Sequence, residues 1–152
     1  MTTKQTFPQS LSLPQFMPYR MVALAKKISD SLAKIYSEEF DLSVAEWRIL
    51  ATLAEHPQEN ARTIAELTAM DKVKVSRAVK RLDEKSLLRK RVSQGDSRAQ
   101  DLSLSAQGLK RYQSIAPSAL AWEAKLLEAL EPEERKEFMT CLEKLERALD
   151  PE

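Results

Sequence analysis

Apolar residues recur every three or four positions along most of the chain, a spacing that places them on one face of an α-helix. The first such run begins at Tyr19, just after Pro18, and predicts a long amphipathic helix that ends near Phe40. The next helix begins at Ser43-Val44-Ala45-Glu46, a capping box whose serine and glutamate side chains satisfy amides of the first turn, and it ends at Pro57. The pattern therefore predicts two helices at the start of the chain.

Two shorter helices are predicted next. Thr63-Ile64-Ala65-Glu66 is a second capping box and predicts a helix to about Met70, while Asp71 is expected to cap a helix over residues 73–85. The apolar face of the later helix has Val75, Ala78, Val79 and Leu82, and its opposite face has Lys74, Arg77, Lys80 and Arg81. Two short helices joined by a tight turn are typical of a helix-turn-helix.

The period of the pattern changes to two in the following segment, as is typical of β-strands. Leu87, Arg89 and Arg91 alternate with Leu88, Lys90 and Val92, as on the two faces of a strand, and Leu102 and Leu104 alternate with polar residues. The segment Gln94-Gly95-Asp96-Ser97 between them consists of turn-forming residues. We expect a two-stranded hairpin, which would form the wing of a winged helix-turn-helix.

Helical spacing returns in the C-terminal part of the chain. Ser105 is placed to cap a helix that Pro117 should kink or split, and Pro132 begins a last helix. The predicted fold class is mainly α (α+β), a winged helix-turn-helix module with a small β-hairpin wing, flanked by N- and C-terminal helices. Because each flanking helix has an apolar face, we expect the two to pair with each other and with a second copy of the chain. Residues 1–15 are expected to form an extended N-terminal arm.

Composition narrows the classes of function. The 152 residues are 43% hydrophobic and 31% charged, which suits one ordered domain. Cys141 and His56 are the only cysteine and histidine, so the sequence excludes an internal disulfide and a cysteine/histidine metal site within one chain. Gly95 and Gly108 are the only glycines, which excludes glycine-rich phosphate loops. With no membrane-spanning run and no signal peptide, we expect a cytoplasmic protein that is not an enzyme and has no cofactor or metal.

The near-neutral net charge of +1 hides an uneven distribution of charge along the chain. Residues 72–98 contain ten basic and three acidic residues, whereas residues 123–152 contain ten acidic and five basic residues. A basic patch of this kind is expected of a surface that binds phosphates, although a solvated helix face is the alternative.

Two segments of the sequence resemble the MarR family of bacterial and archaeal transcription regulators. Residues 96–105, Asp-Ser-Arg-Ala-Gln-Asp-Leu-Ser-Leu-Ser, are similar to the D-x-R…L-x-L-T signature of that family's wing, and residues 70–82 are similar to its recognition helix. Ser86 stands where the family often has glycine, and Ser105 where it often has threonine. The predicted order of elements matches the family from about residue 19 to residue 149.

The resemblance implies a homodimeric regulator of transcription that binds a palindromic site in double-stranded DNA. We expect the regulator to be a repressor that a small molecule releases from DNA. Residues 16–152 would be a single MarR-like domain. Within it, residues 42–105 would be the winged helix-turn-helix that binds DNA, and residues 16–40 and 106–150 would be the dimerisation helices.

The helix over residues 73–85, about 20 Å long, fits the major groove of DNA. Arg77 is the first candidate for reading a base, because a guanidinium pairs bidentately with guanine; a surface salt bridge is the alternative. Lys74 and Ser76, near the start of the helix, are the next candidates. Phosphate contacts are expected from Lys72, Lys80 and Arg81.

The wing and the preceding helix supply the remaining candidates for DNA contacts. The resemblance implies that Arg98 approaches the minor groove while Asp96 orients it, although both residues could serve only to rigidify the turn. Arg89 flanks the wing and is a further candidate for a phosphate contact. Thr63 is expected to contact a phosphate from a helix N-terminus or to act as a cap alone.

The resemblance also implies an effector site between the dimer helices and the winged module. The candidates to line it are Met17, Tyr19, Arg20 and Trp47, together with Phe16 and Met21. Apolar surface with one cation suits an aromatic acid or its CoA thioester. Trp47 as an ordinary core residue is the alternative.

The single cysteine, the single histidine and the basic face of the chain each allow a further interpretation. Cys141 is expected to be a buried structural thiol on the last helix, with a redox switch as the alternative. His56 is expected to end its helix as a C-cap. A helical interaction adaptor whose basic face binds an acidic protein is the alternative to a DNA-binding regulator.

Overall fold

A computed structural model of the chain describes residues 10–150, with the backbone alone described for residues 96–98. In chain order the elements are the 3-10 helix η1 (Leu13–Gln15), α1 (Met17–Ser37), α2 (Val44–Glu55), β1 (Glu59–Asn60), α3 (Ala61–Thr68), α4 (Lys72–Glu84), β2 (Leu88–Ser93), β3 (Asp96–Leu104), α5 (Ala106–Leu127) and α6 (Pro132–Leu149). This order confirms the predicted fold class, a mainly helical chain with a winged helix-turn-helix at its centre.

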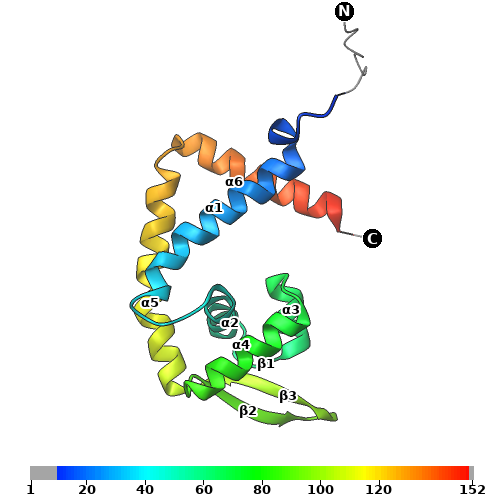
Figure 1. Cartoon of the computed structure of the whole chain (residues 1–152), viewed down its shortest axis with the longest axis vertical. Helices are drawn as coiled ribbons and strands as arrows, with labels where there is room; N and C mark the ends of the chain where they lie inside the picture. Colours follow the sequence, from blue (N-terminus) through cyan, green and yellow to red (C-terminus); the bar gives the residue numbers. More distant parts are fainter. Residues whose placement is uncertain (1–9, 151–152) are drawn as a thin grey trace, which may run out of the picture.

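The elements divide between two ends of the molecule, as Figure 1 shows. The winged module, which comprises α2, α3, α4 and the small sheet, lies at the base of the view. Helix α5 runs from this base along one side of the molecule, and α1 and α6 occupy the other end, where they overlap in the view.

The hydrophobic core lies within the winged module. Its largest fully buried side chains are Tyr36, Ile49, Leu50, Leu53, Ile64, Leu82, Leu87, Ile115 and Val75. Helices α1 and α5 each contribute a single large side chain to it, Tyr36 and Ile115. The core therefore fixes the position of the winged module against the long helices but leaves most of α1 and α5 outside it.

Side-chain caps begin three of the helices where the sequence predicted them. The capping box of α2 is complete, since the Ser43 N–H donates to Glu46 Oε2 over 2.7 Å and the Glu46 N–H donates to Ser43 Oγ over 3.2 Å. The side chains of Asp71 and Ser105 likewise accept first-turn N–H groups of α4 and α5. His56 ends α2 as its C-cap, as predicted.

The predicted start of α3 is wrong. Asn60, not Thr63, is the N-cap, and its Oδ1 accepts the Thr63 N–H over 2.8 Å. Asparagine is at least as good an N-cap as threonine, so the cap three residues earlier begins the helix first. Thr63 consequently lies in the first turn of α3 and does not cap it.

The wing has three strands, whereas the sequence predicted two. Strand β1 pairs antiparallel with β3 through Glu59 and Leu102, and β2 pairs with the other side of β3 from Leu88 opposite Leu104 onward. A two-residue strand is too short to produce an alternating pattern, which is why it gave no signal in the sequence. Gly95 forms the turn between β2 and β3 at a φ of +108°, a conformation that favours glycine.

The N-terminal segment differs from the prediction at residues 13–15. Residues 1–9 lie outside the described residues, but Leu13–Gln15 form η1, so the expectation of an extended arm is wrong there. Helix α1 has Pro18 in its first turn and ends at Ser37, three residues before the predicted end.

Two predictions concern the C-terminal helices. Helix α5 continues through Pro117 to Leu127, so Pro117 does not split it, and a kink at this residue stays a prediction. Cys141 is exposed rather than buried, since α6 has no buried residue in this single chain. Across residues 10–150, none of the helices has the length and hydropathy needed to cross a membrane.

Candidate nucleic-acid interface

Helix α4 presents two different faces to its surroundings. Val75, Ala78, Val79 and Leu82 are its buried residues, as the sequence predicted. Burying this apolar face against the core turns the polar face of the helix toward solvent. Its 13 residues span about 20 Å at 1.5 Å each, a length that suits the major groove of DNA.

The polar side of α4 contains six residues that the sequence singled out. These are Lys72, Lys74, Ser76, Arg77, Lys80 and Arg81, and all six are exposed. We call this set the α4 face. Among the described side chains, Arg81 is its one member with a carboxylate within 4.0 Å. Arg77 therefore has no salt-bridge partner among those side chains.

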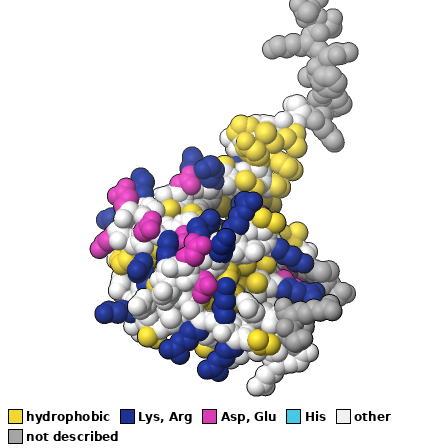
Figure 2. Space-filling view, turned by 60° about the horizontal axis from the view of Figure 1, so that its bottom comes forward, with side chains coloured by type: hydrophobic (Ala, Val, Ile, Leu, Met, Phe, Trp, Pro, Cys, Tyr) yellow, Lys and Arg dark blue, Asp and Glu magenta, His cyan; other side chains and the backbone are white. Residues whose placement is uncertain are grey.

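A groove separates α4 from the wing. Its volume is about 830 Å³. It is lined by Ser76, Val79 and Lys80 of α4, by Asn60, Ala61 and Arg62, and by Lys90, Val92, Ser93, Gln94, Gly95, Ala99, Gln100 and Leu102 of the sheet. In Figure 2, which brings the base of the molecule forward, Lys and Arg side chains spread across this side of the protein.

A second hollow, of about 620 Å³, lies between α4 and the start of α2. Four cations line it: Arg48, Lys74, Arg77 and Arg81. The sequence gave Arg48 no part in binding DNA, because its helix is three elements away from α4 and only the fold brings the two together. Arg62, in the first turn of α3, lines the groove beside the wing, and it is not among the DNA contacts that the sequence predicted.

Asp101 links β3 to β2 and to the residue before β1. Its carboxylate accepts hydrogen bonds from Ser93 Oγ and, over 2.9 Å, from Gln58 Nε2. These two bonds hold the pKa of Asp101 below its usual value. Arg89, a predicted contact, is exposed on β2. The side chains of Asp96 and Arg98 lie outside the described part of the structure, so those two predictions stay untested.

Thr63 lies in the first turn of α3 and is half-buried. The Thr63 N–H donates to Asn60 Oδ1, so this donor is already hydrogen-bonded within the protein. The exposed Arg62 beside it lies 3.6 Å from Glu66 through its Nε.

Glu46 is the one charged residue that is buried among those described. Burial raises the pKa of its carboxyl, but hydrogen bonds from Lys85 and Ser43 outweigh that effect and hold the pKa below its usual value of 4.5. The Lys85 Nζ donates to Glu46 Oε1 over 2.8 Å. A buried ion pair thus joins α2 to the residue that ends α4.

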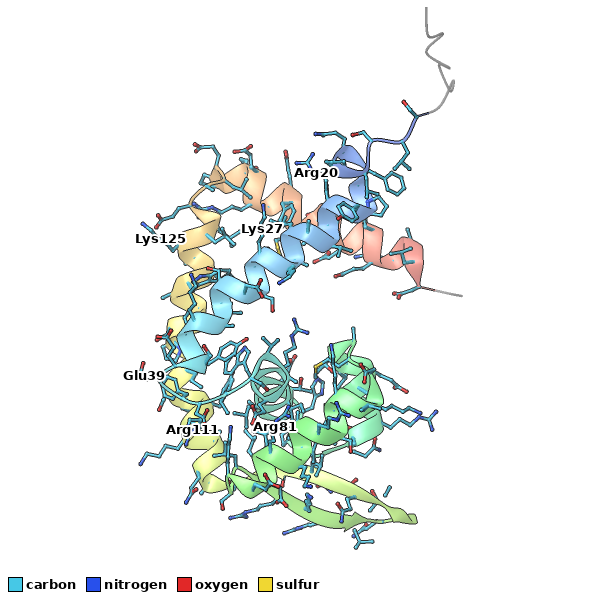
Figure 3. All side chains as sticks on the ribbon, in the orientation of Figure 1. Arg20, Lys27, Glu39, Arg81, Arg111 and Lys125 are labelled. Atoms are coloured by element: carbon cyan, nitrogen blue, oxygen red, sulfur yellow. The ribbon has the colours of Figure 1, made fainter. Side chains whose placement is uncertain are left out.

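The predicted effector residues do not come together as one set. Met17, Tyr19 and Arg20 line a hollow of about 520 Å³ at the start of α1. Figure 3 shows Arg20 at the end of the molecule away from Arg81. Trp47 instead lies between Tyr36 and the α5 residue Tyr112, with ring centroids 5.5 and 5.9 Å apart.

The stack of Tyr36, Trp47 and Tyr112 joins α1, α2 and α5. Burial raises the pKa of Tyr36 above its usual value of 10.0, and the charge of Arg48 offsets part of that rise. Stacked aromatic rings of this kind stabilise the junction between helices beyond the area that they bury.

These features define the class of the protein. A helix-turn-helix formed by α3 and α4, followed directly by an antiparallel wing, is a winged helix-turn-helix. Residues 40–99 match the model of the MarR family. The matched residues include α4 and β2, so the match agrees with the resemblance to the MarR transcription regulators that the wing and recognition-helix motifs indicated.

Solved structures share the fold of this chain. A MarR/EmrR family transcriptional regulator from Acinetobacter sp. ADP1 is similar with a TM-score of 0.82 and 26% identity, covering 92% of this chain and 99% of its own. A MarR family regulator from Silicibacter pomeroyi has a TM-score of 0.78 and 24% identity over 95% of this chain and 99% of its own. A MarR family regulator from Streptomyces coelicolor, solved in complex with DNA, has a TM-score of 0.80 and 22% identity over 95% of this chain and 92% of its own. No curated protein sequence matches the chain.

Proposed function

We propose that the protein is a sequence-specific regulator of transcription that binds double-stranded DNA through α4 and the wing. The observation that carries the proposal is the α4 face, an exposed row of cations on a helix whose other side is buried in the core. The similar fold of a relative solved in complex with DNA supports it.

Each residue of the interface has a proposed role. Arg77 and Lys74 read base edges, together with Ser76, because they lie on the exposed side of a helix that fits the major groove. Phosphates are bound by Lys72, Lys80, Arg81, Arg89 and Thr63. In the wing, Arg98 reaches the minor groove and Asp96 orients it.

The active form is proposed to be a homodimer. The helices at the other end of the molecule expose apolar side chains that a single chain leaves uncovered: Phe16, Met17, Met21, Val22 and Leu24 near the start of α1, and Phe138, Met139, Leu145 and Leu149 on α6. Exposed apolar surface on this scale is typical of an interface between protein chains. Residues 16–40 and 106–150 would then form the dimer, and residues 42–105 would bind DNA.

The dimer would act as a repressor that a small molecule releases. The hollow beside Met17, Tyr19 and Arg20 combines apolar walls with a cation, which suits an aromatic acid or its CoA thioester. A relative from Streptomyces coelicolor was solved with its natural ligand, which supports ligand control in a protein of this fold. A ligand that binds one spacing of the two recognition helices better than the other would change DNA affinity.

A selection experiment tests the proposal. The protein is used to enrich duplexes from a random pool, and the affinity for the enriched duplex is measured over a range of salt concentrations. We expect a palindromic consensus and a log–log slope that steepens by about −0.9 for each phosphate contacted. Enrichment of no consensus, or a slope near zero, would contradict a DNA-binding function.

A further inference from the structure

The carboxylate of Glu46 makes contacts that its role in capping α2 does not require. Its side chain is 3% exposed. One oxygen, Oε2, accepts the Ser43 N–H and completes the capping box. The other, Oε1, accepts the Lys85 Nζ over 2.8 Å, and this contact bridges two helices rather than serving the cap.

Lys85 connects three segments of the molecule. It is the C-cap residue of α4, so its position fixes where the recognition helix ends. Its Nζ donates to the backbone carbonyl of Asp41, in the connection between α1 and α2, and lies 3.7 Å from Asp41 Oδ2. One ammonium group therefore ties the end of α4 to the start of α2 and to the preceding loop.

Arg81 lies between this buried pair and the basic surface. Its Nε is 4.0 Å from Glu46 Oε1, while its side chain remains about half exposed. It lines the hollow of Glu46 and Lys85, and it also lines the hollow with Arg48, Lys74 and Arg77. Figure 3 places Arg81 on the winged module, where α2 and α4 meet.

We propose that Glu46 is a positioning residue of the DNA-binding surface, which fixes the end of α4 through Lys85 and orients Arg81. The inference rests on the proposed DNA-binding function and adds a residue that does not itself contact DNA. Removing one member of a buried ion pair leaves the other without compensation, so α4 should lose its fixed position against α2.

Loss of Glu46 is expected to affect specific and non-specific DNA binding differently. Contacts to base edges need α4 at a defined depth and angle in the groove, whereas non-specific binding needs mainly positive charge near phosphates. Loss of Glu46 removes a negative charge beside Arg81 and so does not weaken non-specific attraction. Specificity, the ratio of the two affinities, should therefore fall.

The experiment compares two duplexes of equal length, one enriched by the wild-type protein from a random pool and one with the same bases in scrambled order. Glu46→Gln, Lys85→Met and the double variant are measured at one salt concentration. Glu55→Gln, which removes an exposed carboxylate at the other end of α2, is the matched control. Circular dichroism at the assay temperature shows which variants are folded.

We expect the affinity ratio to fall about tenfold in each single variant, the effect of one lost charge-assisted hydrogen bond. The double variant should lose no more than either single one, because both changes break the same link. The control should retain the wild-type ratio. A role in stability alone would lower the melting temperature without changing the ratio, since both duplexes bind the same folded population.

An unchanged ratio in a folded variant would overturn the proposal, as would losses that multiply in the double variant. If Glu46→Gln does not fold, the affinity ratio of Lys85→Met alone tests the proposal. The Lys85 side chain is partly exposed, and replacing it leaves the capping box of Ser43 and Glu46 intact. A wild-type protein that enriches no duplex would instead refute the DNA-binding function itself.

Discussion

The basic residues of α4 and its C-cap divide into two groups by the contacts that their side chains make. Lys85 is bound to the buried Glu46 and to the carbonyl of Asp41, so its charge is used within the protein. Lys74 and Arg77 are exposed, and no described carboxylate lies within ion-pair distance of either. A run of cations that looks uniform in the sequence therefore contains both structural and free charges.

At the scale of a single residue, Gly108 is the position least able to accept a side chain. A Cβ added there would lie 2.1 Å from the Leu87 carbonyl oxygen, which is backbone and cannot move aside cheaply. We predict that Gly108→Ala lowers the free energy of unfolding by about 1–3 kcal/mol. Urea denaturation measures this, with the neighbouring exposed Gln107→Ala as the control. Equal stability of the two variants would contradict the close contact.

A second prediction at this scale concerns pH. Because the folded-state pKa of Glu46 is lowered, the ionised carboxylate stabilises the folded protein above the usual pKa of 4.5. That stabilisation should be lost as the pH falls from 4.5 through the lower folded-state value. We expect the difference in unfolding free energy between wild type and Glu46→Gln to be constant above pH 4.5 and to shrink below it. If the difference in unfolding free energy stays the same below pH 4.5, the folded protein does not lower the pKa of Glu46.

At the scale of elements, the beginnings of the helices follow from side-chain chemistry within a few residues. The capping box at Ser43 and the caps at Asp71 and Ser105 could be predicted because each is a local pattern. The cap of α3 was misplaced because Asn60 and Thr63 are both good caps three residues apart, and local sequence does not choose between them.

Substitution of Asn60 tests directly whether this residue, and not Thr63, caps α3. Asn60→Ala should lower the free energy of unfolding by about 1 kcal/mol, because the first-turn N–H of Thr63 loses its acceptor. Thr63→Ala, which removes the Thr63 hydroxyl and leaves the Asn60 acceptor in place, serves as the control and should change stability less. Chemical denaturation of both variants measures the difference. A larger loss for Thr63→Ala would restore Thr63 as the cap.

What the sequence could not predict depends on contacts between distant segments. Strand β1 exists because β3 offers it hydrogen bonds, not because of its own two residues. Arg48 joins the basic hollow only when α2 packs against α4. The buried face and the exposed cations of α4 were predictable, since they follow from the periodicity of one continuous helix.

At the scale of the whole molecule, the two ends of the chain differ in what they leave exposed. The winged module buries most of its large apolar residues and exposes cations, whereas α1 and α6 leave large apolar side chains exposed along their length. A single chain therefore has a completed core at one end and an uncovered surface at the other (Figure 1).

The uncovered surface predicts the oligomeric state. Replacing both Phe138 and Leu145 of α6 with Asp should convert a dimer to a monomer, because it places charges in the proposed apolar interface. Sedimentation equilibrium of the full chain measures the mass, with Leu67→Asp, at an exposed apolar position of the winged module, as the control. A double variant that remains dimeric would show that α6 does not form the interface.

The central claim is that the α4 face binds duplex DNA, and the affinity of Arg77→Ala tests it most directly. Fluorescence anisotropy with a duplex enriched by the wild-type protein gives the dissociation constant at fixed salt. We predict that Arg77→Ala weakens binding by about 1–3 kcal/mol. Lys125→Ala, which removes the same charge from α5 far from the wing (Figure 3), should bind like the wild type. Equal affinities for the two variants would contradict the account.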